Sequence, residues 1–285
     1  MSDKNIKAQP PEKLTGIELT EVPKKAVGTK AIQSALSHVF SETGVAKGIS
    51  LLKNINQING FDCPGCAWPD PDEKRAFLAE YCENGAKAVA EEATKNRVSS
   101  LFFATHSIQE MSEWSDYEIG KSGRITHPMY LKEGSDTYEE ISWEDAFSII
   151  GKELNTLKSP DEAIFYTSGR TSNEAAFLYQ LFVRQFGTNN LPDCSNMCHE
   201  SSGSGLSETL GIGKGSVTLD DFNHADLVIV IGQNPGTNHP RMLTALKDTK
   251  KNGGKIMTIN PLPEVGLMNY VDPQNPLKWL GSGDK

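Results

Sequence analysis

Residues 226–260 carry the clearest structural signal in the chain, DLVIVIGQNPGTNHPRMLTALKDTKKNGGKIMTIN. The run Asp226–Ile231 has no polar alternation after its first residue, which is typical of a parallel strand buried on both faces. A helix over residues 241–251 follows, and Lys255–Asn260 is the next strand. This β-α-β pattern predicts an α/β fold with a doubly wound, mostly parallel sheet.

Two loops leave the carboxyl ends of these strands, residues 232–239 and 260–263. In such sheets ligands bind beyond those ends. The first loop offers free amides and amide side chains, which suit a nucleotide or a pyrophosphate. It is not a GxGxxG motif and has no Walker lysine, so an ordinary βα connection with good turn residues explains it equally well.

Apolar residues at helical spacing predict helices elsewhere in the chain. The ranges are residues 31–48, 73–95 and 143–157. Residues 124–143 look like strands and turns, and residues 162–167 form a short β-prone run. The helix that follows is expected to begin with a capping box made by Thr171 and Glu174 and to close at Gly187.

The composition limits the functional classes. The chain has 285 residues and a net charge of −9, whereas a general nucleic-acid binder usually carries a basic balance. No run approaches about 18 consecutive apolar residues. The N-terminus is polar and lacks the apolar core of a signal peptide. We therefore expect a cytoplasmic protein with neither nucleic acid nor a membrane span.

Five cysteines, an odd number, favour metal ligation or redox chemistry over a disulfide framework in a reducing compartment. Cys63 and Cys66 form a CxxC pair in a loop rich in proline and glycine, and this spacing lets two thiolates face one metal centre. Zinc, or an ordinary turn with two unpaired thiols, are the alternatives. Cys82 is either a third ligand or a small residue buried in a helix.

Other residues with chemical potential have simpler explanations beside them. Asp70 could supply an oxygen ligand, but an ordinary loop aspartate explains it too. Lys87 could conduct charge between two redox centres, whereas helix lysines are usually solvated. Cys198 could be a metal ligand, a nucleophile with His199 as base, or a buried structural cysteine. Side chains of sequence neighbours point apart, which disfavours the nucleophile–base pair.

Together these motifs resemble one family. Residues 187–190, followed by two cysteines of which the second precedes His199, are similar to the active-site segment of formate dehydrogenases of the dimethyl sulfoxide reductase superfamily. The loop at residues 232–241 resembles that family's loop for one of two molybdopterin guanine dinucleotides. The branch that the chain resembles, the FdhF/YdeP-type molybdopterin oxidoreductase alpha subunits, is indicated by CPGCAWPDP at 63–71 and CENGAK at 82–87.

The resemblance implies a Mo-bis(molybdopterin guanine dinucleotide) cofactor and a 4Fe–4S cluster. Cys198 would ligate molybdenum, His199 would handle the substrate proton or orient the substrate, and Lys87 would lie between cluster and pterin. The cluster ligands would be Cys63, Cys66 and Cys82. The dinucleotide contacts would be Gly232, Gln233, Asn234, Thr237, Asn238 and Asn260.

The resemblance also implies a domain plan. Residues 1–25 would be a flexible lead, 26–125 a small iron–sulfur region, and 126–285 an incomplete molybdopterin-binding α/β domain. Two features depart from the family. Asp70 occupies the usual position of the third cluster cysteine, so it could complete the ligand set or the cluster could be lost. Relatives are more than twice as long, so later domains that bind the second dinucleotide would be missing.

The predicted activity is formate-dehydrogenase-like, the oxidation of formate to carbon dioxide. Electrons would leave through the pterin, Lys87 and the cluster to an electron-acceptor protein or an NAD-linked subunit. The isolated 285-residue chain is expected to be inactive. Alternatives are the same scaffold acting on another oxyanion or an N-oxide, a non-catalytic cofactor-binding remnant, and an α/β nucleotide-binding domain.

Overall fold

The computed structural model describes residue 21 and residues 23–66, 68–72, 75–76, 79–169, 171–192 and 194–278, with the backbone alone for residues 194–198 and 276. Contacts divide the chain into two compact units, residues 1–139 with 219–285, and residues 140–218. The domain boundary predicted near residue 125 does not coincide with this division and stays a prediction.

The first unit joins an N-terminal helical part to a C-terminal β-α-β part. Its first elements are β1 (Ala26–Val27), α2 (Gly28–Thr43), α3 (Val45–Asn54), α4 (Glu83–Glu92), β2 (Arg97–Val98), α5 (Ser100–Thr105), α6 (Ile108–Ser112), α7 (Asp116–Ser122), β3 (Arg124–Ile125) and β4 (Met129–Tyr130). Its later elements are α11 (Asp221–His224), β6 (Leu227–Ile231), α12 (Pro235–Asn238), α13 (Met242–Lys251), β7 (Lys255–Ile259), α14 (Val265–Met268), β8 (Tyr270–Val271) and η2 (Pro276–Lys278). β1 pairs with β8 in parallel, and this pairing connects the two parts.

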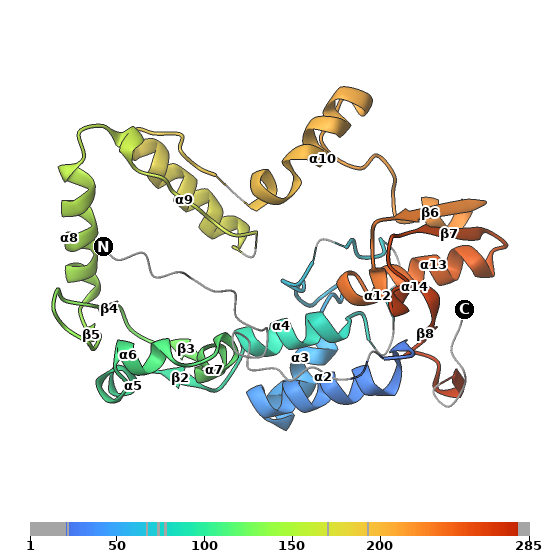
Figure 1. Ribbon diagram of the computed structural model, residues 1–285, viewed down its shortest axis with the longest axis horizontal. Helices are drawn as coiled ribbons and strands as arrows, with labels where there is room; N and C mark the ends of the chain where they lie inside the picture. The colour runs from blue at the N-terminus through green and yellow to red at the C-terminus, as the bar shows by residue number, and fades with distance from the viewer. Residues whose placement is uncertain are drawn as a thin grey trace. The chain divides into compact units, whose positions relative to one another are not determined.

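The helical part has its core between α2, α3 and α4, which lie side by side (Figure 1). The helix predicted over residues 31–48 is two helices, because Gly44 takes a φ of 79° that ends α2. Val39 and Ile55 are the most deeply buried large side chains of this core. Burying such a side chain contributes about 1.5–3 kcal/mol. The buried members are Ala35, Val39, Leu52, Ile55, Ala86, Val89 and Ala90.

The helix predicted from residue 73 begins instead at Glu83, with Cys82 as its N-cap. The described residues among 68–82 are not helical, so the prediction is wrong there. Side chains from another segment donate hydrogen bonds to backbone carbonyls that would accept from backbone amides in a helix. Asn56 donates to the carbonyl of Glu80 at 2.7 Å, and Gln57 donates to that of Ala76 at 3.3 Å.

The β-α-β unit at the C-terminal end confirms the sequence prediction in its main features. β6 and β7 run parallel, with Leu227 opposite Lys255, and α13 crosses between them. One sheet face packs on α13 through Val230, whereas Ile229 on the other face is 48% exposed. The prediction of a strand buried on both faces is therefore wrong for the described chain. Its described sheets are two-stranded, so the doubly wound sheet stays a prediction.

The second unit contains three long helices. Its elements are α8 (Trp143–Thr156), η1 (Pro160–Glu162), α9 (Asn173–Phe186) and α10 (Cys194–Leu210), and β5 (Glu139–Glu140) lies at its start. The N-cap of α9 is Ser172, which accepts from the amide of Ala175, and not the predicted Thr171. The β-prone residues 162–167 do not form a named strand. No helix in the described part of the chain is long and apolar enough to cross a membrane.

Candidate functional site

The loop after β6 begins at Gly232, whose φ of 65° lies in the left-handed region that favours glycine. The Gly232 amide donates to the carbonyl of Ile259 at 2.8 Å, so the loops after β6 and β7 start side by side. The side-chain amide of Asn260 donates to the carbonyl of Gln233 at 3.4 Å. The structure thus brings together three of the residues predicted to contact a dinucleotide.

Two polar atoms of this strand-end loop, residues 232–240, are buried without a hydrogen-bond partner. They are Oδ1 of Asn234 and Nδ1 of His239. Leaving such a group unpaired costs about 1–3 kcal/mol. Unsatisfied groups in native structures point to a ligand or another functional cause. This loop therefore fits a polar ligand of the kind that a nucleotide presents.

The short helices α12 and α14, which follow β6 and β7, approach each other through glycines. A Cβ placed on Gly236 would lie 2.5 Å from the Cα of Gly266, and one placed on Gly266 would lie 2.2 Å from Oδ1 of Asn234. Neither position has room for a side chain. Thr237 and Asn238, also predicted contacts, lie on α12 with exposed side chains.

The cysteine loop, residues 61–82, lies in the same unit. A Cβ placed on Gly85 would be 2.7 Å from Sγ of Cys63 and 3.7 Å from Sγ of Cys82, so these thiols converge on that glycine. The amide of Gly65 donates to the Cys63 sulfur, and that of Gly85 donates to the Cys82 sulfur, each at 3.3 Å. Cys66 is exposed.

Burial raises the pKa of both the Cys63 and the Cys82 thiols, and the Cys66 sulfur adds to that rise. The glycine amides that donate to these sulfurs, and the Arg241 guanidinium, act in the opposite direction. A metal would have to bind the thiolate forms, so such donors favour ligation.

The donor set suits a thiolate-bound metal but is not complete. Among the residues that the structure describes, no three His, Cys, Asp or Glu side chains converge closely enough to hold a metal ion. Asp70, the possible fourth ligand, instead forms an ion pair with Arg241, with 2.6 Å between Oδ1 and Nη1. The hypothesis that Asp70 completes the cluster therefore finds no support in its position.

Lys87 lies on α4 and pairs with Glu83 one helical turn earlier, with 2.7 Å between Nζ and Oε1. Its side chain is 32% exposed. This is the ordinary behaviour of a lysine on a partly solvated helix face. A role between two redox centres stays a prediction.

The Cys198-His199 pair belongs to the second unit, on α10. The backbone departs from helical geometry at His199, with φ −126° and ψ 16°, and the His199 side chain is exposed. The side chain of Cys198 lies outside what the structure describes. The predicted molybdenum ligand therefore has a place on a kinked helix, and its role stays a prediction.

The pattern of the molybdopterin oxidoreductase family matches residues 124–280, which is more than half of the chain. The chain belongs to the molybdopterin oxidoreductase family. The matched residues contain both the Cys198-His199 pair and the strand-end loop.

Relatives in this family are much longer. The chain is 56% identical over 267 residues to an uncharacterized oxidoreductase of Mycobacterium tuberculosis, which covers 93% of this chain and 34% of the relative. It is 49% identical to protein YdeP of Escherichia coli, over 91% of this chain and 34% of the relative. A putative formate dehydrogenase of Staphylococcus haemolyticus is 29% identical, over 59% of this chain and 18% of that protein. The chain thus spans about a third of the length of the first two.

The sequence prediction missed one group of residues in this member of the family. Arg241 contacts both Asp70 and Glu80 from the cysteine loop. No local pattern marks these three as partners, because more than 150 residues separate Arg241 from the two acids. The one sequence feature that points to Arg241 is its position directly after the strand-end loop, whose last residue is Pro240.

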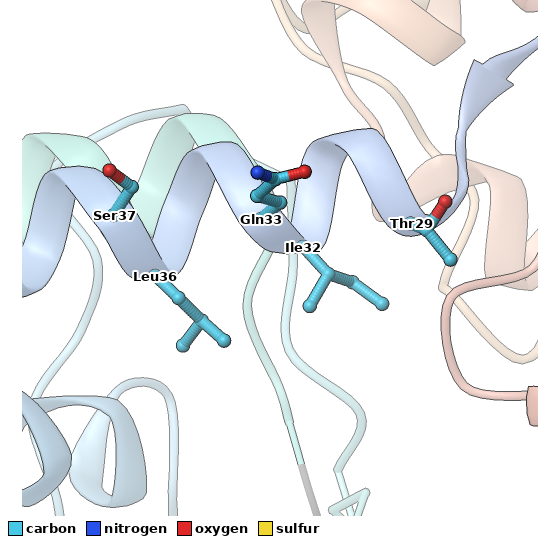
Figure 2. A pocket seen from close by; sticks show the side chains of 5 residues that line it. All are labelled: Thr29, Ile32, Gln33, Leu36 and Ser37. Atoms are coloured by element: carbon cyan, nitrogen blue, oxygen red, sulfur yellow. The ribbon is translucent and has the colours of Figure 1, made fainter.

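An apolar groove also lies on α2, with Ile32 and Leu36 pointing to the same side of the helix (Figure 2). Its volume is about 510 Å³, and Thr29, Gln33 and Ser37 complete its lining. None of the predicted site residues lines it.

Proposed function

We propose that the chain forms the part of a molybdenum-dependent, formate-dehydrogenase-like oxidoreductase that holds one molybdopterin guanine dinucleotide. Cys198 is proposed as the thiolate ligand of the metal. The Cys63, Cys66 and Cys82 thiols are proposed as ligands of an iron–sulfur cluster. Family membership and the oxidoreductase names of the relatives support the general chemistry. Formate rests on the predicted active-site segment and on one distant relative named a putative formate dehydrogenase.

One observation carries the proposal. Asn234 and His239 each hold a buried polar atom without a partner in the loop that follows a parallel strand. Strand ends of this kind are where α/β sheets bind nucleotides. The proposed ligand would give Oδ1 of Asn234 a donor and would pair with Nδ1 of His239.

The reaction is balanced as formate giving carbon dioxide, one proton and two electrons. When bound, the molybdenum supplies the acceptor for those two electrons. His199, exposed on the kinked helix α10, is proposed to take the proton or to orient the carboxylate. An electron-acceptor protein or an NAD-linked subunit is the proposed partner.

Metal analysis of protein purified without oxygen tests the general chemistry. Molybdenum together with iron is the expected result. Zinc alone would reassign Cys63 and Cys66 to a structural zinc site, and an absence of all three metals would favour a non-catalytic remnant. Another oxyanion or an N-oxide as the substrate would leave the metal content unchanged and fail only in the formate assay.

Paired variants of the full-length protein test the site. Asn234→Ala is expected to lose molybdenum, whereas Asn223→Ala, at a half-buried asparagine whose side chain donates to Asp220 at the surface, is expected to keep it. Cys198→Ser is expected to abolish turnover with iron retained. Unaltered turnover in Cys198→Ser would contradict its assignment as the metal ligand.

A further inference from the structure

Arg241 is a largely but not fully buried cation between the cysteine loop and the strand-end loop. It is the N-cap residue of α13, and its side chain is only 14% exposed. Nη1 lies 2.6 Å from Oδ1 of Asp70, and Nη2 donates to Oε1 of Glu80 at 2.7 Å. Both carboxylates belong to the cysteine loop, so one guanidinium holds two points of that loop.

The charges of this group are balanced. Arg75 approaches the other oxygen of Asp70 at 3.7 Å, which gives two cations and two anions. Asp70 and Glu80 are 21% and 11% exposed. Removing one member of a largely buried ion pair is destabilising, because the remaining charge loses its partner where water reaches it only in part.

Hydrogen bonds continue from this group to the cysteine backbone. The carbonyl of Glu80 accepts from the side-chain amide of Asn56, and Oδ1 of Asn56 accepts from the amide of Cys63 at 2.8 Å. The other oxygen of Glu80 accepts from the amide of Ala76 at 2.6 Å. Glu80 is thus bound at its side chain and its backbone, and it transmits the position of Arg241 to Cys63.

A second connection lies beyond Cys82. The side-chain amide of Asn84 donates to the carbonyl of Thr237 at 2.9 Å. Cys63 and Cys82, whose thiols converge on Gly85, are therefore tied to the strand-end loop by two separate routes.

We propose that Arg241 is a positioning residue, held by Asp70 and Glu80 in an ionic clamp that fixes the cysteine loop against the strand-end loop. Asp70 serves as a counter-ion of this clamp and not as a metal ligand. A planar guanidinium can hold two carboxylates at once, which a lysine cannot do with the same geometry. That the thiols positioned by this clamp are cluster ligands rests on the proposed function, but the clamp itself does not.

Hydrogen exchange on the metal-free protein tests the clamp without any cofactor. In Arg241→Gln, amides of residues 57–66 and 233–240 are expected to exchange faster by about tenfold or more. The matched control is Arg124→Gln, whose ion pair with Glu92 spans 3.5 Å and is about half exposed. The control is expected to leave both segments within about twofold of wild type. Should Arg241→Gln fail to fold, Arg241→Lys, which keeps the charge, is measured in its place, with faster exchange in both segments again expected.

Iron binding then separates a counter-ion from a ligand. Wild-type and variant proteins are reconstituted with ferrous iron and sulfide, and iron content and the visible spectrum are recorded. The clamp predicts the same partial loss in Asp70→Asn, Arg241→Gln and the double variant, with recovery in Asp70→Glu. If Asp70→Asn loses iron while Arg241→Gln keeps it, Asp70 is a ligand and the proposal is overturned. Exchange unchanged in both segments of the Arg241 variant would also overturn it.

These outcomes are distinguishable from a failure of the proposed function. A protein that binds no molybdenum and no iron would contradict the proposed oxidoreductase. The exchange experiment would still decide whether Arg241 fixes the cysteine loop.

Discussion

The helices α4 and α8 have similar sequence patterns and opposite surroundings. Each combines an apolar stripe with charged positions. In α4, Ala86 and Val89 are buried in the core formed with α2 and α3. In α8, Trp143 and Phe147 are 61% and 64% exposed. An apolar stripe therefore predicts a face that needs a partner, but it does not say whether the described chain provides one.

The largest expected effect is at the core on which α4 packs. Ile55 is fully buried there, and Ile55→Ala is expected to lower the free energy of unfolding by about 2–5 kcal/mol through lost burial and a cavity. Ile150→Ala on α8, at a residue 53% exposed, is the matched control and should change it by less than about 1 kcal/mol. Urea unfolding measures both, and equal losses would mean that the two helices are equally covered in solution.

A buried carboxylate next to that core gives the next largest effect. Glu42 accepts from Nζ of Lys121 at 2.5 Å and from the Thr94 hydroxyl at 2.6 Å. Glu42→Gln is expected to cost about 1–3 kcal/mol in the free energy of unfolding at neutral pH. The exposed pair of Lys132 and Glu139 provides the control, since Glu139→Gln should cost no more than about 1 kcal/mol.

The effect of Glu42 should depend on pH with a definite sign. Burial alone would raise the pKa of Glu42, but hydrogen bonds from Lys121 and Thr94 outweigh it and leave the pKa below its usual value of 4.5. A depressed pKa in the folded state stabilises above the unfolded pKa, and that stability is lost as the pH falls through the folded value. The difference between wild type and Glu42→Gln should therefore be full near pH 7 and shrink below pH 4.5. A difference that grows on acidification would contradict this account.

A smaller effect on stability is expected at the start of α8, the helix whose apolar stripe is exposed. Ser142 caps α8 by accepting from the amide of Asp145 at 3.0 Å, and Ser142→Ala should cost about 1 kcal/mol. Ser148→Ala, at an exposed position in the middle of α8, is the control and should leave helix content unchanged or slightly higher. Circular dichroism and hydrogen exchange of residues 143–156 measure the difference. Equal fraying in both variants would show that the cap is not used.

The smallest effect on stability is expected for the exposed apolar stripe of α8 itself. Phe147→Gln should change the free energy of unfolding by less than about 0.5 kcal/mol, because the ring is largely solvated already. Its main result should be less self-association, measured by sedimentation, since exposed apolar patches promote association. A loss of several kcal/mol would show that α8 has a partner in solution and would remove the contrast with α4.

The parts of the fold that the sequence predicts are those with a local cause. The runs 227–231 and 255–259 are short, mostly apolar and rich in β-branched residues, which favours strands, and the helix 242–251 repeats apolar residues at helical spacing. Helix α9 closes at Gly187 as predicted, because that residue adopts the left-handed conformation.

The parts that could not be predicted depend on distant partners. Residues 73–82 have a helical pattern, but hydrogen bonds from Asn56 and Gln57 hold the described residues of this segment in another conformation. The candidate site shows the same limit. That the loops after β6 and β7 are adjacent can be inferred from the parallel pairing of these strands. The contact of Arg241 with Asp70 cannot be inferred in this way, because nothing in the sequence around one residue indicates the other.

The close approach of Gly236 and Gly266 has a consequence for how this sequence can vary. A Cβ on Gly236 would lie 2.5 Å from the Cα of Gly266, and one on Gly266 would lie 2.8 Å from the Cα of Gly236, so at both positions the obstacle includes main chain, which no second substitution can remove. When both positions are randomised and the variants are selected for cofactor binding, every selected variant should keep glycine at both positions. Epistasis should not rescue them, unlike side-chain collisions in a core, which compensating changes can relieve. The two glycines would then identify sequences that can bind the cofactor more reliably than any of the polar residues around them.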